Sequence, residues 1–385
     1  MDGSASSKEV ARYLSDKFLL LLYVVIFFAL VLFVQLFFFL FFIIAFSKKK
    51  KLTTVVTPPL TVIVCAHDEL ENLQQLLPLL IEQDYPEYEI IIVNDRSNND
   101  TFDWLMKQSN LYPKLKYVNI EKTPEHINGK KYGITLGVRA ATHEWLVFTD
   151  ADCRPTSPNW LREMAKAIQP KSQFVLGISP YLRQPGMLNK FIRFEAWITI
   201  WQYMGFALNG MPYMGVGRNL AYRKSLFMER KGFNQFLSII GGDDDLFVNQ
   251  HATSVNTAVA LSADAVVESV PATNWKAFFN QKVRHLAAGK KYRSRHKIVL
   301  GIWMTSWLFI HPIAIALLFS FYSKWVALAL VFRVILMIVA LHIVFKQWKQ
   351  QFELWAIPLL DYFYPIYYLT TGITAFVTKK IRWKN

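Results

Sequence analysis

The stretch that decides the fold is Trp145-Leu-Val-Phe-Thr-Asp-Ala-Asp152, a short apolar run that ends in two carboxylates. A run of this length, bounded by polar residues, is typical of a strand buried within a sheet. Three similar runs precede it along the chain, at Leu60–Ala66, Glu89–Val93 and Lys116–Ile120. We therefore predict four buried strands in this part of the chain.

Helical patterns alternate with these strands, at Leu70–Gln83, Thr101–Lys107, Lys131–Ala141 and Asn159–Ile168. The alternation predicts an α/β domain with a mostly parallel sheet flanked by helices. Such sheets bind ligands at the carboxyl ends of their strands. The residues that directly follow each strand are therefore the first candidates for a functional site.

The composition combines a high apolar content with a strong positive charge. Hydrophobic residues make up 53% of the 385 residues and charged residues only 18%, yet the formal net charge is +15. Disorder is excluded, because disordered chains are poor in aromatic residues and rich in charge. The two cysteines, Cys65 and Cys153, are too few for a disulfide scaffold. The balance favours a membrane protein with its basic residues on one side, or a protein that binds an anion.

An uncharged apolar run at residues 18–46 is long enough to cross a bilayer as a helix. Lys48–Lys51 follow it. By the positive-inside rule, these lysines place the next domain, residues 52–297, on the cytoplasmic side of an inner or plasma membrane.

The chain becomes apolar again at residues 298–377. Residues 298–321 and 325–345 are two predicted spans, and residues 354–377 are a third segment that Asp361 and two prolines interrupt. A complete third crossing would put the basic tail Lys379–Lys384 outside, against the positive-inside rule. The third segment is therefore either a span, a re-entrant segment or an interfacial helix.

Polar side chains gather after the predicted strands and in two later segments. They are His67, Asp68 and Glu69 after the first strand, Asp95 after the second, Asp150 and Asp152 after the fourth, and then Asp243, Asp244, Asp245, Gln281 and Arg284. A single acidic residue after a strand is usually a helix cap or a turn former. Several carboxylates at one sheet edge repel one another unless a cation is present, so the pattern indicates a cation-assisted site.

In order and spacing these segments resemble the family 2 glycosyltransferases, whose fold is called GT-A. The resemblance covers roughly residues 60–291. It rests on Thr61–Asn72, Gln83-Asp-Tyr-Pro86, Glu89–Ser97, Gly129-Lys130, Asp150-Ala-Asp152, Gly215–Arg223, Asp243-Asp244 and Gln281-x-x-Arg284. The arrangement of one N-terminal span, a domain and C-terminal spans is similar to that of lipid-directed transferases such as ceramide glucosyltransferase.

The resemblance implies a UDP-sugar donor and a divalent cation, Mg²⁺ or Mn²⁺. It implies donor contacts from His67, Asp68, Glu69, Asp95, Lys130, Asp150, Gln281 and Arg284, metal ligation by Asp150 and Asp152, and acceptor-side roles for Gly217, Asn219 and His285. The metal would stabilise the departing diphosphate as a Lewis acid. Simpler alternatives stay open: Asp95 could close a turn with Ser97, Lys130 and Arg284 could be surface cations, and Asp150-Ala-Asp152 could be a solvated turn.

Direct displacement at the anomeric carbon inverts its configuration and requires a base for the acceptor hydroxyl. The resemblance and the spacing to Pro271 favour Asp244, with Asp243 and Asp245 as close rivals. Adjacent carboxylates raise at least one pKa, which suits a base. An acidic helix cap is the alternative, and it is compatible with a basic role.

His285 stands where the family has Trp, the residue that stacks on the growing chain of processive members. This departure favours a membrane lipid hydroxyl as the acceptor over a polysaccharide, which remains the alternative. A non-enzymatic membrane protein that binds nucleotide sugars or lipids is disfavoured by the intact Asp150-Ala-Asp152 motif. An all-helical isoprenoid transferase is disfavoured by the strands, and nucleic acid by the carboxylate-lined strand ends.

Two further features concern the membrane. Residues Met187–Leu208 combine aromatic residues with Lys190 and Arg193, which fits an interfacial helix that brings a lipid acceptor to the site or a buried helix of the domain. Arg333 and Asp361 lie within apolar segments, where a lone charge is costly, so we predict that they pair.

Overall fold

The computed structural model describes residues 7–47, 57–124, 127–237, 239 and 241–378. Both Lys48–Lys51 and the basic tail Lys379–Lys384, on which the topology argument depends, lie outside these residues.

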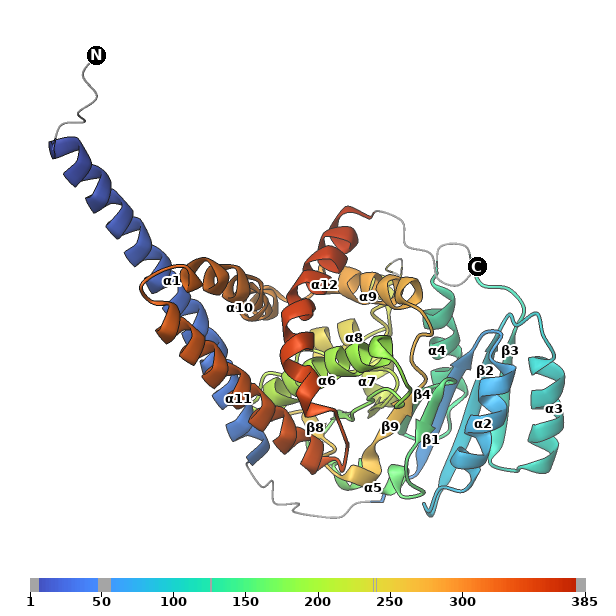
Figure 1. Cartoon of the computed structure of the whole chain (residues 1–385). Helices are drawn as coiled ribbons and strands as arrows, with labels where there is room; N and C mark the ends of the chain where they lie inside the picture. The colour runs from blue at the N-terminus through green and yellow to red at the C-terminus, as the bar shows by residue number, and fades with distance from the viewer. Residues whose placement is uncertain (1–6, 48–56, 125–126, 238, 240, 379–385) are drawn as a thin grey trace.

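A seven-stranded sheet forms the centre of the domain, in the order β3-β2-β1-β4-β7-β6-β8 (Figure 1). Its strands are β1 (Leu60–Ala66), β2 (Tyr88–Asp95), β3 (Leu115–Ile120), β4 (Trp145–Asp150), β6 (Phe174–Leu176), β7 (Leu220–Arg223) and β8 (Thr257–Val259). The pairs among β1 to β4 are parallel, as predicted, whereas β7 pairs antiparallel with both β4 and β6. A second, two-stranded sheet pairs β5 (Cys153–Pro155) with β9 (Val267–Ser269).

Helices cover both faces of the large sheet, which explains why its central strands are apolar on both sides. Val62 and Val64 of β1 pack with helices α2 (Leu70–Ile81), α3 (Thr101–Leu111) and α5 (Trp160–Lys166) on one face. Ile63, between them, packs with α4 (Gly129–Ala140) and α6 (Met187–Leu208) on the other. The remaining short elements are α7 (Lys224–Glu229), α8 (Asp245–His251) and the 3₁₀ turns η1 (Asn234–Phe236), η2 (Ala263–Ala265) and η3 (Leu354–Ala356).

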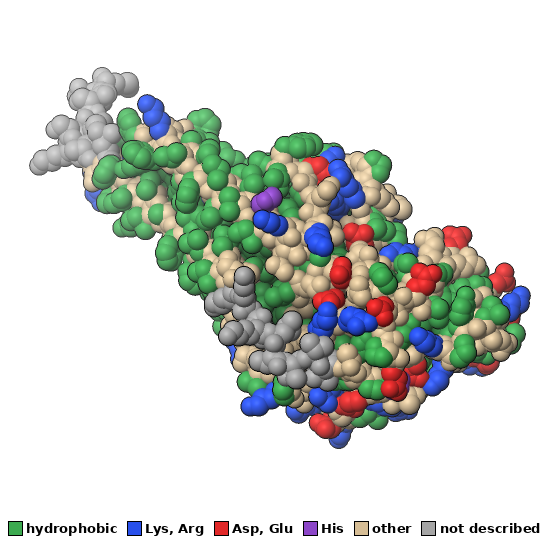
Figure 2. Space-filling model, turned by 90° about the horizontal axis from the view of Figure 1, so that it is seen from below, with side chains coloured by type: hydrophobic (Ala, Val, Ile, Leu, Met, Phe, Trp, Pro, Cys, Tyr) green, Lys and Arg blue, Asp and Glu red, His purple; other side chains and the backbone are tan. Residues whose placement is uncertain are grey.

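A helical arm projects from the domain (Figure 1). It consists of α1 (Ser7–Ser47), α10 (Ser294–Leu318) and α11 (Ser323–Gln347), which pack against one another. Three helical segments in the described part of the chain are long and apolar enough to cross a membrane: Ser15–Ser47, Ser294–Leu318 and Ser323–Gln347. Figure 2 shows hydrophobic side chains over this arm, whereas charged side chains are spread over the surface of the α/β domain beside it. One N-terminal and two C-terminal apolar helices are thus confirmed.

The third apolar segment forms α12 (Ile357–Val377), which is not among these candidate spans. It packs against α9 (Trp275–Gly289), α10 and α6, between the arm and the sheet domain (Figure 1). The predicted pairing within the apolar segments is confirmed, because both guanidinium nitrogens of Arg333 bond to the carboxylate of Asp361, at 2.6 and 2.9 Å.

Helix α6 is a buried helix of the domain, and this decides between the two interpretations of residues 187–208. Sixteen of its residues are buried, including Trp197 and Trp201. It packs against α1, α11, α12 and β8. Its aromatic residues therefore join the domain to the arm and are not exposed to a membrane surface.

Candidate active site

The carboxyl ends of β1, β2 and β4 meet at one edge of the sheet. In the strand register, Cys65 of β1 lies beside Asp150 of β4, and Ala66 lies beside Asn94 of β2. The sequence-predicted residues that follow these strands therefore converge, as the parallel arrangement requires.

A cavity of about 590 Å³ opens at this edge. It is lined by residues of the sheet edge, of the segment around α8 and of the helices α6, α9, α10 and α12. Most of the predicted site residues lie on its wall: His67, Glu69, Asp95, Lys130, Asp150, Asp152, Asp243, Asp244, Asp245, Gln281, Arg284 and His285.

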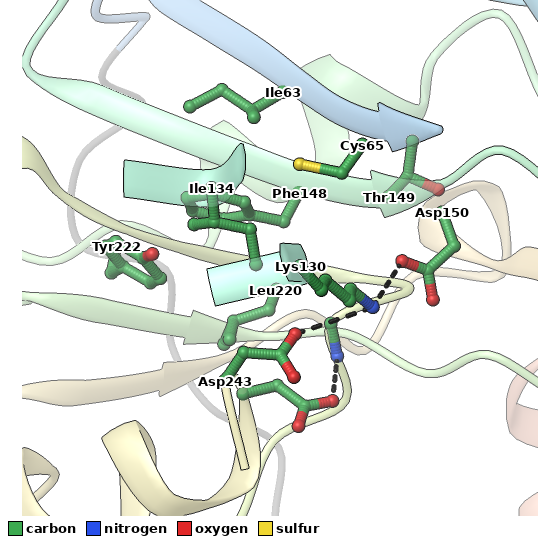
Figure 3. Close-up of a pocket in the computed structure, with 12 residues that line it drawn as sticks. Ile63, Cys65, Lys130, Ile134, Phe148, Thr149, Asp150, Leu220, Tyr222 and Asp243 are labelled. Carbon is green, nitrogen blue, oxygen red and sulfur yellow. Dashed lines mark hydrogen bonds and ion pairs between the residues drawn. The ribbon is translucent and has the colours of Figure 1, made fainter. Parts of the chain in front are cut away.

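Lys130 connects two of the predicted carboxylates (Figure 3). Its Nζ lies 2.8 Å from Oδ1 of Asp150 and 3.4 Å from Oδ2 of Asp243. Burial disfavours the charged ammonium, but Asp150, Asp243 and Asp244 outweigh this cost and raise the pKa of Lys130 well above its usual range. A permanent cation therefore stands between two carboxylates that are far apart in the sequence.

The start of α4 needs a glycine at the position before this lysine. A Cβ atom on Gly129 would lie 2.4 Å from Nη2 of Arg96 and 2.8 Å from Oδ2 of Asp95. The Asp95 carboxylate accepts two hydrogen bonds from Arg96, at 2.7 and 3.1 Å. Gly129 thus leaves room for a bonded pair that would otherwise be displaced.

Asp150 ends β4, and Asp152 lies in the tight turn that leads to β5. Burial and the neighbouring Asp150 carboxylate raise the pKa of Asp152 to about 6, which indicates that the pair lacks full charge compensation. Carboxylate oxygens are the ligands that Mg²⁺ and Mn²⁺ prefer. No group of three or more His, Cys, Asp or Glu in the described ranges could hold a metal alone. A cation held by this pair would take its further ligands from a bound anion or water.

The three successive carboxylates at 243–245 have different environments. Asp244 accepts hydrogen bonds from the backbone N–H of Gly217 at 2.6 Å and of Asp245 at 2.7 Å, so it is a helix cap as well. Burial and the Asp243 carboxylate raise its pKa to about 6. Burial and Asp244 raise the pKa of Asp245 to about 8, and its Oδ2 accepts a hydrogen bond of 2.7 Å from the Tyr292 hydroxyl. Burial therefore disfavours the charged form of Asp245 more strongly than that of Asp244.

The loop after β1 is held by the loop after β2. Nδ1 of His67 lies 2.5 Å from the carbonyl oxygen of Asp95. Asp68, with a φ of 55°, accepts a hydrogen bond from the N–H of Asn98 at 2.7 Å, and its own N–H donates to the Ser97 hydroxyl. The Asp68 side chain is thus directed at a neighbouring loop and is not on the cavity wall.

Helix α9 contributes the Gln281, Arg284 and His285 side chains to the cavity. Burial lowers the pKa of Arg284 from its usual value. Burial and the surrounding cations lower the pKa of His285 well below its usual range, so this imidazole is neutral. His285 keeps an accessible surface inside the cavity, where it can touch a ligand.

Asn219, which the resemblance places on the acceptor side, is fully buried. Its amide nitrogen donates to the carbonyls of Ile178 and Ala265, and its oxygen accepts from the Trp160 indole. The side chain cannot reach an acceptor from this position. Gly217 has a local role, because its N–H donates to Asp244.

Four side chains at the site were not predicted from the sequence. Arg218, inside the Gly215–Arg223 motif, lines the cavity and stacks over Tyr181 at 4.5 Å. Glu195 of α6 and Lys282 of α9 form an ion pair of 2.6 Å on the cavity wall. Lys131 is fully buried, and its ammonium donates to the carbonyls of Phe236 and Ile239, which anchors the segment before Asp243.

The family model of "Glycosyl transferase family 21" matches residues 22–385, which is nearly the whole chain. The chain belongs to glycosyl transferase family 21. The sequence-based expectation of a membrane-anchored glycosyltransferase is therefore confirmed, with family 21 as the family that matches.

Curated relatives agree with this membership. The chain is 25% identical to the "Probable glycosyltransferase YdaM" of Bacillus subtilis over 241 aligned residues. The alignment covers 60% of this chain and 55% of that protein. It is 28% identical over 93 residues to the "Poly-beta-1,6-N-acetyl-D-glucosamine synthase" of Staphylococcus epidermidis, 24% of this chain and 21% of that one. The chain thus spans about half the length, or less, of these relatives.

A solved structure confirms the GT-A fold of this glycosyltransferase. The mannosyltransferase PcManGT from Pyrobaculum calidifontis, in complex with GDP-Man and Mn²⁺, aligns with a TM-score of 0.60 at 18% identity, over 93% of this chain and 99% of that one. At this identity the likeness concerns the fold alone.

Proposed function

We propose that this glycosyltransferase moves a sugar from a UDP-sugar to the hydroxyl of a membrane lipid, with inversion at the anomeric carbon. The observation that carries the proposal is that one cavity is shared: one part of its wall holds the carboxylates of the strand ends, and another holds α10, a candidate membrane span. A polar donor and a lipid acceptor can therefore reach the same space.

The donor end of the cavity suits a nucleotide diphosphate. Asp150 and Asp152 would hold the divalent cation, which supplies Lewis-acid stabilisation of the leaving diphosphate when bound. Lys130 and Arg284 add positive charge to the same wall. Arg218 is a further candidate donor contact, since its buried Nη1 has no hydrogen-bond partner among the residues that the structure describes. The mannosyltransferase of similar fold, whose structure contains GDP-Man and Mn²⁺, supports this chemistry.

The reaction we propose is a single displacement. The acceptor oxygen forms a bond to the anomeric carbon, the bond from that carbon to the diphosphate breaks, and the leaving UDP keeps the electron pair. The acceptor proton passes to the carboxylate of Asp244, which the Gly217 N–H orients. Asp243 is less available because it pairs with Lys130, and Asp245 is less available because its Oδ2 accepts a hydrogen bond from the Tyr292 hydroxyl.

The test is transfer from a panel of UDP- and GDP-sugars by the full-length protein in vesicles of total membrane lipid. Removing a general base costs about 10²–10⁴ in rate. We expect Asp244→Asn to lose activity on this scale while it still binds the donor. Undiminished transfer by Asp244→Asn would remove Asp244 as the base.

A polysaccharide product is the second candidate, and the Staphylococcus epidermidis synthase among the relatives favours it. His285 in place of the family's Trp counts against it.

Membrane anchoring is proposed to place the catalytic domain on the cytoplasmic side. Protease digestion of sealed right-side-out and inside-out vesicles tests that orientation, because only inside-out vesicles should expose the domain.

A further inference from the structure

The cavity continues beyond the residues that the proposed reaction uses. At its far end it is lined by Lys297, Leu300, Gly301 and Met304 of α10 and by Tyr364 and Tyr368 of α12. These α10 positions are separated by three, four and seven residues, so they form one face of the helix. The two tyrosines are four residues apart and also share a face. Both helices therefore turn one side toward the cavity.

This end of the cavity lies at the level of a membrane span. Helix α10 is a candidate span from Ser294 to Leu318. The stretch from Lys297 to Met304 corresponds to roughly 10 Å of helix at 1.5 Å per residue. The cavity wall thus runs along α10 from its cationic first turn toward the apolar depth of the arm, and its lining changes from charged to aromatic and aliphatic.

The same cavity also carries polar side chains from α6 and α9. Glu195 is buried, and Lys282 neutralises it at 2.6 Å from helix α9. Oε1 of Gln281 is buried without a hydrogen-bond partner in the part of the chain that the structure describes. These groups offer hydrogen bonds to a polar head group and no net charge. In Figure 1, α9 lies beside α12 on the side nearer the sheet.

We propose that the hydrocarbon chain of the acceptor lies in this far end of the cavity and enters it laterally between α10 and α12, past Gly301. The inference rests on the proposed function, because it takes the acceptor to be a membrane lipid. The head group then lies at the Glu195–Lys282 pair with its hydroxyl toward Asp244. The carbohydrate chain of a processive enzyme would find an aliphatic and aromatic wall at this end, which suits hydrocarbon better.

Gly301 permits a selective test. A Cβ atom at Gly301 meets no heavy atom within 4 Å, so a side chain added there projects into open space. Gly372 of α12 is equally open but does not line the cavity. Gly301→Leu should therefore block the path, whereas Gly372→Leu makes the same chemical change elsewhere. Gly301→Ala provides a smaller obstruction that is still expected to fold.

The experiment uses the full chain in membranes of cells grown on a diazirine-bearing fatty acid, so that every membrane lipid carries a photoreactive chain. After irradiation, adducts are mapped by mass spectrometry. Tyr364 has only 2% of its surface exposed and lines the cavity, so an adduct there requires a lipid inside the cavity. Phe321 is 99% exposed and serves as the internal standard for bulk lipid.

We expect an adduct on Tyr364 that falls at least fivefold in Gly301→Leu, falls less in Gly301→Ala and is retained in Gly372→Leu, with Phe321 labelled in all. The Michaelis constant for lipid acceptor should rise by at least tenfold in Gly301→Leu and should not rise in Gly372→Leu. An unlabelled Tyr364 beside a labelled Phe321, or equal labelling in Gly301→Leu, overturns the inference. Absence of transfer to any lipid by the unmodified enzyme overturns the proposed function instead, whatever the labelling pattern.

Discussion

Asp361 is the residue whose replacement tests the packing of α12 against the membrane arm most sharply. Its carboxylate accepts two hydrogen bonds from the Arg333 guanidinium, at 2.6 and 2.9 Å, and lies 3.4 Å from Nε2 of His311. Arg333 also donates to Gln35 of α1. One ionic cluster therefore connects α1, α10, α11 and α12, and both charged side chains are almost completely buried.

The expected cost of Asp361→Asn follows from this burial. Removing one partner of a buried ion pair leaves the other charge uncompensated and costs about 3–5 kcal/mol. At about 2 °C per kcal/mol for a domain of this size, the melting temperature should fall by about 6–10 °C. Arg333→Met should destabilise by a similar amount. The double variant removes both charges, so its loss should be smaller than the sum of the two single losses by about 2–3 kcal/mol.

The assay is thermal unfolding of the purified protein in one detergent, with the two single variants and the double variant measured together. Asp84→Asn is the matched control, because Asp84 pairs with Arg162 at 2.8 Å but is 67% exposed. Exposed pairs contribute about 0–1 kcal/mol, so this variant should melt within about 2 °C of the unmodified protein. Additive losses in the Asp361 and Arg333 variants would refute the coupling of these two charges.

Three further predictions concern the active site. The pKa of Asp244 is raised to about 6, so the proposed base is ionised above that pH. The value of kcat/KM should therefore fall about tenfold for each pH unit below 6. A flat pH profile of kcat/KM down to pH 5 would contradict the assignment of Asp244 as the base. EDTA should abolish transfer, and added Mn²⁺ or Mg²⁺ should restore it. The Asp150→Asn variant should need a higher metal concentration for the same rate. Transfer that resists EDTA would exclude the proposed metal role. Gly129→Ala should raise the donor KM by about tenfold, because the new Cβ would lie 2.8 Å from the Asp95 carboxylate. The control variant Gly372→Ala should leave the donor KM unchanged. Equal donor KM values in the two variants would show that Asp95 does not contribute to donor binding.

Local pattern was sufficient to predict the sheet edge. Trp145–Asp150 and Leu60–Ala66 are short apolar runs with polar ends, and the parallel pairing that follows from the helices between them brings Asp95 and Asp150 to one edge. The ion pair of Arg333 and Asp361 could be predicted in the same way, because an unpaired charge in an apolar helix carries a high free-energy cost.

Contacts between distant segments could not be predicted in this way. Glu195 lies in a largely apolar helix and Lys282 in a basic one, and only the packing of α6 near α9 makes them partners. Asn219 shows the opposite case, because its motif suggested an acceptor contact while the amide is committed to buried carbonyls. The antiparallel insertion of β7 also depends on tertiary pairing, since a strand of four residues carries little periodic signal.

The most direct test of the proposed function is the fate of labelled sugar in total membranes that contain the enzyme. With a radiolabelled UDP-sugar panel and Mn²⁺, we predict label in a small glycolipid that partitions into organic solvent and carries the inverted anomeric configuration. Asp244→Asn membranes should give no such product at comparable enzyme levels. Label retained in an insoluble polymer, or no transfer from any nucleotide sugar, would contradict the account.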